Sequence, residues 1–136
     1  MSTFLKRVLV VFGTRPEAIK MAPVVRALQQ HPEQFVVRTC ATAQHREMLD
    51  QVLNVFGITP DIDLDLMQPD QSLSSLAARV FTALDPVLLA EKPDWVLVQG
   101  DTTTVMAAAL VAQHRQVRVG HVEAGLRTHD RRNPFP

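Results

Sequence analysis

Two carboxylates, Asp101 and Glu123, each stand at the end of an apolar run that has the composition of a buried strand. A carboxylate at the end of a buried strand must be paired, protonated or functional. Two carboxylates in different environments are what general acid and base catalysis requires, so both residues are predicted to be catalytic. Because Asp101 also stands at the start of a predicted helix, capping of that helix is at least as well supported for this residue.

Cationic side chains gather after another apolar run. The run Val8–Phe12 is followed by the pattern Thr-x-x-Glu from Thr14 to Glu17, which is typical of a helix capping box. A strand that leads directly into a helix N-terminus attracts anions through free N–H groups and the helix dipole. Since Arg15 and Lys20 add positive charge at this place, a phosphate site is one hypothesis. An ordinary strand-to-helix junction with two solvated cations is the alternative.

Apolar runs and helical patterns alternate along the whole chain. Runs rich in β-branched residues predict strands at 8–12, 35–41, 95–99 and 117–123. Alternating apolar and acidic residues predict a short edge strand at 62–66. Apolar residues at helical spacing predict helices at 17–30, from a Thr42 cap to 56, from a cap at Ser72 or Ser74 to about 92, and from the 100–104 turn to 113. This order predicts an α/β fold: an open parallel doubly wound (Rossmann-like) sheet with strand order 3-2-1-4-5.

In such sheets ligands bind outside the carboxyl ends of the strands, and every polar cluster of this chain lies at one of those ends. The charged residues on this rim are Arg15, Lys20, Arg46, Arg127, Asp101 and Glu123. They predict a crevice that holds a polyanion beside two carboxylates, in which Arg127 joins Arg15 and Lys20 in binding the substrate. The alternative is that the loops of any α/β protein are polar.

Motifs of several other kinds of site are missing from the sequence. The first strand-to-helix loop is neither Gly-x-Gly-x-x-Gly nor Gly-x-x-x-x-Gly-Lys-Ser/Thr, which disfavours NAD and P-loop sites, so no cofactor is expected. No serine stands in a Gly-x-Ser-x-Gly elbow. The five histidines lack metal-ligand spacing, so no metal site is expected. His121 is predicted to be a core histidine rather than a ligand.

The overall composition indicates where the protein works. A formal net charge of zero gives no indication of nucleic acid or of an anionic membrane as a partner. No apolar run reaches transmembrane length, and the N-terminus lacks the pattern of a signal peptide. Cys40 is the single cysteine, which excludes an intrachain disulfide and favours a reducing compartment. These features predict a cytoplasmic protein that binds neither nucleic acid nor a membrane.

Four stretches of the chain resemble the bacterial non-hydrolysing UDP-N-acetylglucosamine 2-epimerases. They are residues 11–23, 42–51, 100–104 and 120–128, and the resemblance runs from about Lys6 to Pro136. It implies an isomerase that interconverts UDP-GlcNAc and UDP-ManNAc without NAD, by anti elimination of UDP to a glycal and re-addition of UDP to the other face. Such a reaction needs a base, an acid and cations for the departing diphosphate, which suits the rim described above.

The resemblance also implies roles for single residues. Four residues match family positions implicated in binding or catalysis: Arg15, Lys20, Asp101 and Glu123. Gln44 matches a position near a second, regulatory UDP-GlcNAc site. The implied enzyme is a homodimer whose partners are UDP-GlcNAc and UDP-ManNAc.

The fold implied by the resemblance has two Rossmann-like domains with the active site between them, the glycosyltransferase-B arrangement. Residues 1–136 are then expected to be the N-terminal Rossmann-like domain, itself incomplete, without the C-terminal UDP-binding domain and inactive alone. Two alternatives stay open. One is a hydrolysing epimerase or glycosyltransferase relative, and the other is a non-catalytic module that binds a nucleotide sugar.

Overall fold

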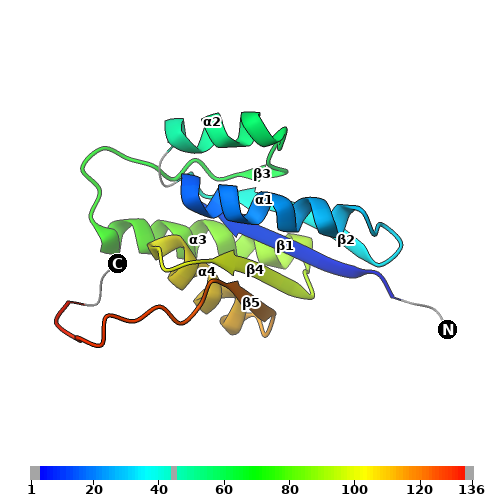
Figure 1. Cartoon of the computed structure of the whole chain (residues 1–136). Coiled ribbons are helices and arrows are strands. Elements are labelled where there is room, and N and C mark those ends of the chain that lie inside the picture. The colour runs from blue at the N-terminus through cyan, green and yellow to red at the C-terminus, as the bar shows by residue number, and fades with distance from the viewer. Residues whose placement is uncertain (1–3, 44–45, 134–136) are drawn as a thin grey trace.

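The computed structural model describes residues 4–43 and 46–133, which form one parallel sheet with helices on both faces (Figure 1). The strands are β1 (Lys6–Phe12), β2 (Phe35–Ala41), β3 (Ile62–Asp63), β4 (Trp95–Gln99) and β5 (Arg118–Val122). The helices are α1 (Arg15–Gln29), α2 (Arg46–Phe56), α3 (Leu73–Glu91) and α4 (Thr103–His114). All four strand pairings are parallel, and the strand order is β3-β2-β1-β4-β5, which confirms the predicted order.

The central strand β1 separates two hydrophobic cores because its side chains alternate between the two faces of the sheet. Leu9 and Val11 pack in one core with residues of α3 and α4, which include Leu84 and Val111. The residues Val8, Val10 and Phe12 pack in the other core with residues of α1 and α2, which include Met21 and Leu49. Figure 1 shows the two helix pairs on opposite sides of the sheet, as the predicted doubly wound fold requires.

The helix starts follow the predicted capping residues in one case and depart from them in another. Ser72 caps α3, since its Oγ accepts a hydrogen bond of 3.1 Å from the N–H of Ser75. The predicted Thr42 cap is wrong, because α2 begins at Arg46 and Thr42 still belongs to the sheet. Its N–H donates to the Phe12 carbonyl and its own carbonyl accepts from the N–H of Leu66, both at 2.9 Å.

Helix α3 is the one described helix that is long and apolar enough to cross a membrane. One face of it, made of Leu76, Val80, Leu84 and Leu88, is buried against the sheet. This burial is the behaviour of a core helix in a globular domain.

β5 lies at the edge of the sheet, as the predicted strand order requires, although its residues are less buried than a strand built for burial would be. Arg118 and His121 are exposed, and Val119 and Val122 are half-buried. Among the described residues, no strand pairs with the outer side of β5.

The 136-residue chain is expected to self-associate through this edge, because unpaired N–H and C=O groups beside half-buried valines favour pairing with a second copy. Light scattering at several protein concentrations should show a mass that rises with concentration. Hydrogen exchange at Val119 and His121, whose N–H groups point away from β4, should slow over the same range. A monomer whose β5 amides are protected equally at every concentration would contradict this prediction.

Candidate active site

The carboxyl ends of β1, β4 and β5 bring together loops that lie far apart in the sequence. A hollow of about 190 Å³ opens at this end of the sheet. Its lining includes Asp101, Thr102, His121, Glu123 and Arg127. The structure thus places both predicted carboxylates and one predicted cation around a single hollow.

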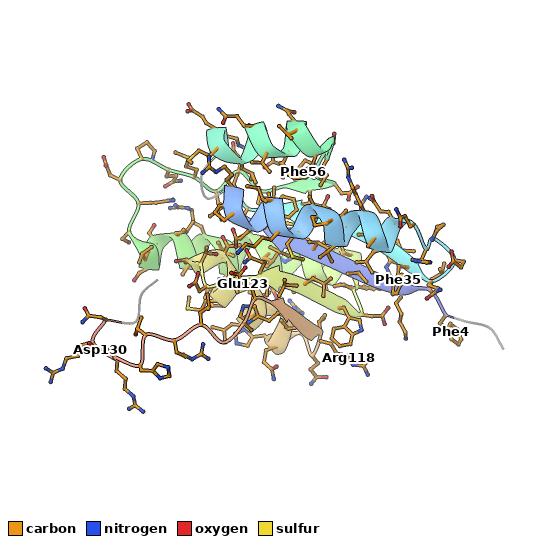
Figure 2. All side chains as sticks on the ribbon, viewed as in Figure 1. Phe4, Phe35, Phe56, Arg118, Glu123 and Asp130 are labelled. Carbon is orange, nitrogen blue, oxygen red and sulfur yellow. The ribbon has the colours of Figure 1, made fainter. Side chains whose placement is uncertain are left out.

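The side chain of Glu123, which is labelled in Figure 2, contacts residues of two other elements. Glu123 follows β5 directly, in a left-handed backbone conformation with a φ of 56°. Its Oε2 accepts a hydrogen bond of 2.7 Å from Nε2 of Gln99 on β4 and forms an ion pair with Nζ of Lys20 on α1. The side chain is 37% exposed, so the prediction of a carboxylate at a buried strand end is wrong in its burial but right in its need for a partner.

The pairing with Lys20 shifts the pKa of Glu123. The Lys20 ammonium lowers the pKa of the Glu123 carboxyl, and the hydrogen bond from Gln99 acts in the same direction. Glu123 is therefore ionised at neutral pH and able to accept a proton. Sequence reasoning placed Lys20 and Glu123 on the same rim but gave no reason to pair them.

Asp101 is not the cap of α4. The cap is Thr102, whose Oγ1 accepts a hydrogen bond of 3.3 Å from the N–H of Val105. Asp101 lies one residue earlier and is exposed, and within the described part of the chain no hydrogen bond or ion pair engages its carboxylate. The capping alternative is therefore wrong, and the carboxylate is available to a ligand in the hollow.

His121 is exposed and lines the same hollow, so the prediction of a core histidine is wrong. Its Nε2 lies 2.5 Å from the carbonyl oxygen of Gly100. Because a carbonyl only accepts, Nε2 carries the hydrogen in this contact. No signal in the sequence pointed to this placement of His121.

Glu17 is the residue of this region that sequence reasoning described only in part. Its side chain is buried, with 1% of its surface exposed. Oε2 accepts hydrogen bonds from the N–H groups of Gly13 and Thr14, at 3.0 and 2.6 Å, and from the Thr14 hydroxyl at 2.7 Å. The capping box predicted this half of the arrangement. The other half, a 2.7 Å hydrogen bond from Thr102 Oγ1 to Oε1, crosses to a different loop.

These contacts alter the phosphate hypothesis for the α1 N-terminus. The carboxylate of Glu17 already occupies the N–H groups of Gly13 and Thr14, and Pro16 has none. An anion at this place would therefore depend on side-chain cations rather than on a cradle of backbone N–H groups. Arg15 is exposed, and none of the described residues forms an ion pair with it.

The four cations of the predicted rim have different surroundings. Arg46 forms ion pairs with Asp50, Asp63 and Asp65 beneath the β3 edge, and these carboxylates raise its pKa further. The prediction that Arg46 faces a polyanion is therefore wrong, because its charge is already neutralised. Gln44, the predicted regulatory residue, lies outside the described residues.

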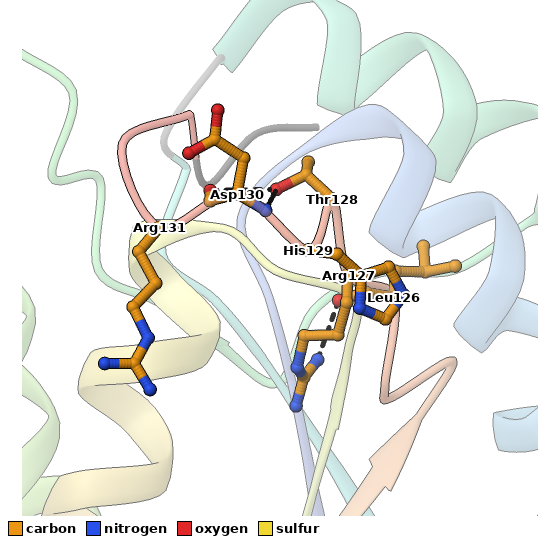
Figure 3. Close-up of a pocket in the computed structure, with 6 residues that line it drawn as sticks. All are labelled: Leu126, Arg127, Thr128, His129, Asp130 and Arg131. Carbon is orange, nitrogen blue, oxygen red and sulfur yellow. Dashed lines mark hydrogen bonds between the residues drawn. The ribbon is translucent and has the colours of Figure 1, made fainter.

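The loop that carries Arg127 forms a second and larger hollow of about 390 Å³, lined by residues 126–131 (Figure 3). Nη1 of Arg127 donates a 2.7 Å hydrogen bond to the carbonyl oxygen of Leu126. Figure 3 shows this bond, and Arg127 also lines the hollow that contains Asp101 and Glu123. The guanidinium has further N–H donors, so this single bond leaves it able to bind an anion.

Burial of Glu17 predicts a measurable dependence of stability on pH. Desolvation raises the pKa of Glu17, although the surrounding hydrogen bonds oppose the rise. The folded chain then holds a proton that the unfolded chain has released, so the free energy of unfolding falls as the pH rises from about 4.5 through the raised pKa. Urea unfolding over this range should show wild-type stability falling relative to Glu17→Gln, in which this titration is absent. If the difference in unfolding free energy between wild type and Glu17→Gln stays constant with pH, the expected proton uptake by Glu17 is contradicted.

Comparison with known proteins agrees with this architecture. A sequence profile described as UDP-N-acetylglucosamine 2-epimerase matches residues 26–136. The chain belongs to this family. The UDP-N-acetylglucosamine 2-epimerase of Salmonella typhimurium is 58% identical over 130 residues, which are 96% of this chain and 34% of that protein.

Solved structures of UDP-N-acetylglucosamine 2-epimerases have the same fold. The enzyme from Neisseria meningitidis, bound to UDP-GlcNAc, superposes with a TM-score of 0.89 at 55% identity, over 96% of this chain and 35% of that chain. The enzyme from Methanocaldococcus jannaschii, in complex with UDP-GlcNAc and UDP, superposes with a TM-score of 0.86 at 36% identity, over 94% of this chain and 35% of that chain. The chain thus spans about a third of the length of these relatives, and the inferred resemblance to UDP-N-acetylglucosamine 2-epimerases is confirmed.

Proposed function

We propose that residues 1–136 form the N-terminal Rossmann-like domain of a non-hydrolysing UDP-N-acetylglucosamine 2-epimerase. The observation that carries this proposal is the hollow in which an unpartnered carboxylate, Asp101, and a paired carboxylate, Glu123, lie beside Arg127. Two carboxylates in unequal surroundings suit a reaction that removes a proton on one face of a sugar and returns one on the other.

The proposed reaction begins with removal of the C2 proton of UDP-GlcNAc by a carboxylate. The electron pair forms a C1–C2 double bond, the bond from C1 to the diphosphate oxygen breaks, and UDP leaves as an anion. UDP then adds back to C1 while C2 receives a proton on the opposite face, which yields UDP-ManNAc. Glu123 is ionised and suits proton removal, and Asp101 is placed to serve the other proton transfer.

Lys20 couples binding of the diphosphate to proton removal by Glu123. It pairs with Glu123 in the structure, and Arg15 lies on the same first turns of α1. A diphosphate that binds Lys20 and Arg15 competes with Glu123 for the ammonium group. As Lys20 turns to the diphosphate, the pKa of Glu123 rises and the carboxylate becomes a stronger base. Substrate binding thus prepares Glu123 for proton removal.

The remaining properties of the enzyme are proposals that follow the family resemblance. The partners are UDP-GlcNAc and UDP-ManNAc, the enzyme is a cytoplasmic homodimer without a cofactor, and a C-terminal domain binds UDP. Gln44 contributes to a regulatory UDP-GlcNAc site. Because the uridine site lies in that other domain, residues 1–136 alone are proposed to be inactive.

The test is turnover of UDP-GlcNAc, followed by NMR, by a family-length enzyme, meaning this chain together with the part that its relatives have beyond it. Accumulation of UDP-ManNAc supports the proposal. Release of free ManNAc and UDP would instead identify a hydrolysing relative, and binding without turnover would identify a nucleotide-sugar-binding module. The 136-residue chain serves as the comparison and should produce no UDP-ManNAc.

Arg15→Ala in the family-length enzyme is expected to lower kcat/KM roughly 10- to 150-fold, which corresponds to the roughly 1.5–3 kcal/mol of a charge-assisted hydrogen bond. The side chain is exposed at the α1 N-terminus, so folding should be unaffected. Arg7→Ala is the matched control, because Arg7 is an exposed arginine at the opposite end of β1. Unchanged kcat/KM, or a collapse of thermal stability in Arg15→Ala, would indicate a structural role for Arg15.

A further inference from the structure

We infer that Glu17 and Thr102 act together as positioning residues that hold Asp101 in place against α1. The hydrogen bond between them joins the first turn of α1 to the loop before α4, across 85 residues of sequence. The expected effect on kcat rests on the proposed function. The expected effect on the position of Asp101 concerns the fold alone.

Glu17 is built into the core as an acceptor of four donors. One oxygen accepts from Gly13 and twice from Thr14, and the other accepts from Thr102 at 2.7 Å. The capping box needs only the first oxygen, so the bond to Thr102 goes beyond the ordinary function of a residue at this helix position. A buried carboxylate is costly, and its full set of donors offsets that cost.

The hydrogen bonds of Thr102 fix the backbone next to Asp101. Its hydroxyl oxygen accepts from the Val105 N–H, and its single hydroxyl hydrogen donates to Glu17. Both functions of the hydroxyl are therefore used, which fixes the rotamer of Thr102 and the start of α4. Asp101 is the preceding residue, so the direction of its backbone is set by the same two bonds.

The residue on the other side of Asp101 is also held. The N–H of Gly100 donates a 3.0 Å hydrogen bond to the Val122 carbonyl, and its own carbonyl oxygen contacts His121. Asp101 thus stands between two anchored residues, while none of the described residues engages its own carboxylate. Such an arrangement presents a carboxylate in a fixed position without lowering its availability to a ligand.

Three substitutions separate positioning from capping. Thr102→Val removes the hydroxyl, and Thr102→Ser keeps it. Glu17→Gln keeps an oxygen for Gly13 and Thr14 but turns an NH₂ group toward Thr102, so the hydroxyl hydrogen of Thr102 loses its acceptor. Ser72→Ala is the matched control, because it removes the corresponding cap hydrogen bond from α3, away from the hollow.

The first measurement is ¹⁵N relaxation on the 136-residue chain. Thr102→Val and Glu17→Gln should lower the order parameter of the Asp101 amide from about 0.85, typical of rigid backbone, to below about 0.6. Thr102→Ser and Ser72→Ala should leave it unchanged. An unchanged Asp101 order parameter in both Thr102→Val and Glu17→Gln would overturn the inference, whether or not the family-length enzyme is an epimerase.

The second measurement is the kinetics of the family-length enzyme. Thr102→Val should lower kcat by about tenfold or more while KM changes by less than about twofold, because a misplaced reacting group costs rate rather than binding. Thr102→Ser should restore kcat, and Ser72→Ala should keep it despite a comparable loss of stability. Equal losses of kcat in Thr102→Val and Ser72→Ala would overturn the catalytic part. An absence of epimerisation by the wild type would instead count against the proposed function, and the order parameter would still decide the positioning.

Discussion

Glu123→Gln in the family-length enzyme is expected to lower kcat by about 10²–10⁴-fold, the range for loss of a general acid or base. Glutamine keeps an oxygen that accepts from Gln99, so the shape of the site is retained, but it neither accepts the C2 proton nor pairs with Lys20. Steady-state rates of UDP-ManNAc formation measure this effect.

The control for Glu123→Gln is Asp85→Asn. It removes the carboxylate of another exposed ion pair, between Asp85 of α3 and Arg115, and it leaves the hollow untouched. Its kcat should stay within about twofold of wild type, since exposed ion pairs contribute little to stability. Wild-type turnover in Glu123→Gln would mean that this carboxylate only anchors Lys20.

Asp101→Asn is expected to lower kcat by a comparable factor of about 10²–10⁴, with little change in stability. Among the described residues nothing bonds to the Asp101 carboxylate, so its replacement should leave the melting temperature of the 136-residue chain nearly unchanged. This separation of activity from stability is characteristic of a residue that serves a ligand rather than the fold.

Two measurements together decide the role of Asp101. Thermal unfolding of the 136-residue chain reports on the fold, and kcat of the family-length enzyme reports on the reaction. A large drop in melting temperature with kcat unchanged would make Asp101 a structural residue. Full activity with full stability would remove it from the reaction.

The fold was predictable from the sequence because its determinants are local. Four apolar runs and one short alternating segment, separated by helical patterns, leave few arrangements for a parallel sheet. The central run Val8–Phe12 has the composition of a strand covered on both faces. Ser72 and the Thr14–Glu17 capping box are likewise local signals. Each of them agrees with the structure.

The chemistry of the site was predictable only in part, because partners and exposure depend on distant segments. The prediction that Asp101 and Glu123 lie together is confirmed, because the carboxyl ends of parallel strands meet at one edge of the sheet. Local sequence gave no indication that Arg46 is neutralised by Asp63, which comes from another element. It also gave no indication that Glu17 contacts Thr102.

The errors for His121 and Thr42 have the same physical origin. His121 alternates with valines as a core residue would, but β5 is an edge strand and that position faces the hollow. Thr42 has the residue type of a helix cap, but the hydrogen bonds of the sheet extend one residue past β2 and hold it there. In both cases tertiary pairing overrides a local preference.

The most direct test of the proposed reaction is the fate of the C2 hydrogen when the family-length enzyme converts UDP-GlcNAc in D₂O. Elimination and re-addition with carboxylate acids and bases predicts deuterium at C2 of the UDP-ManNAc product, observed by NMR as loss of the C2 proton signal. If the UDP-ManNAc formed in D₂O keeps its original C2 proton, that result would contradict proton removal by Glu123 or Asp101.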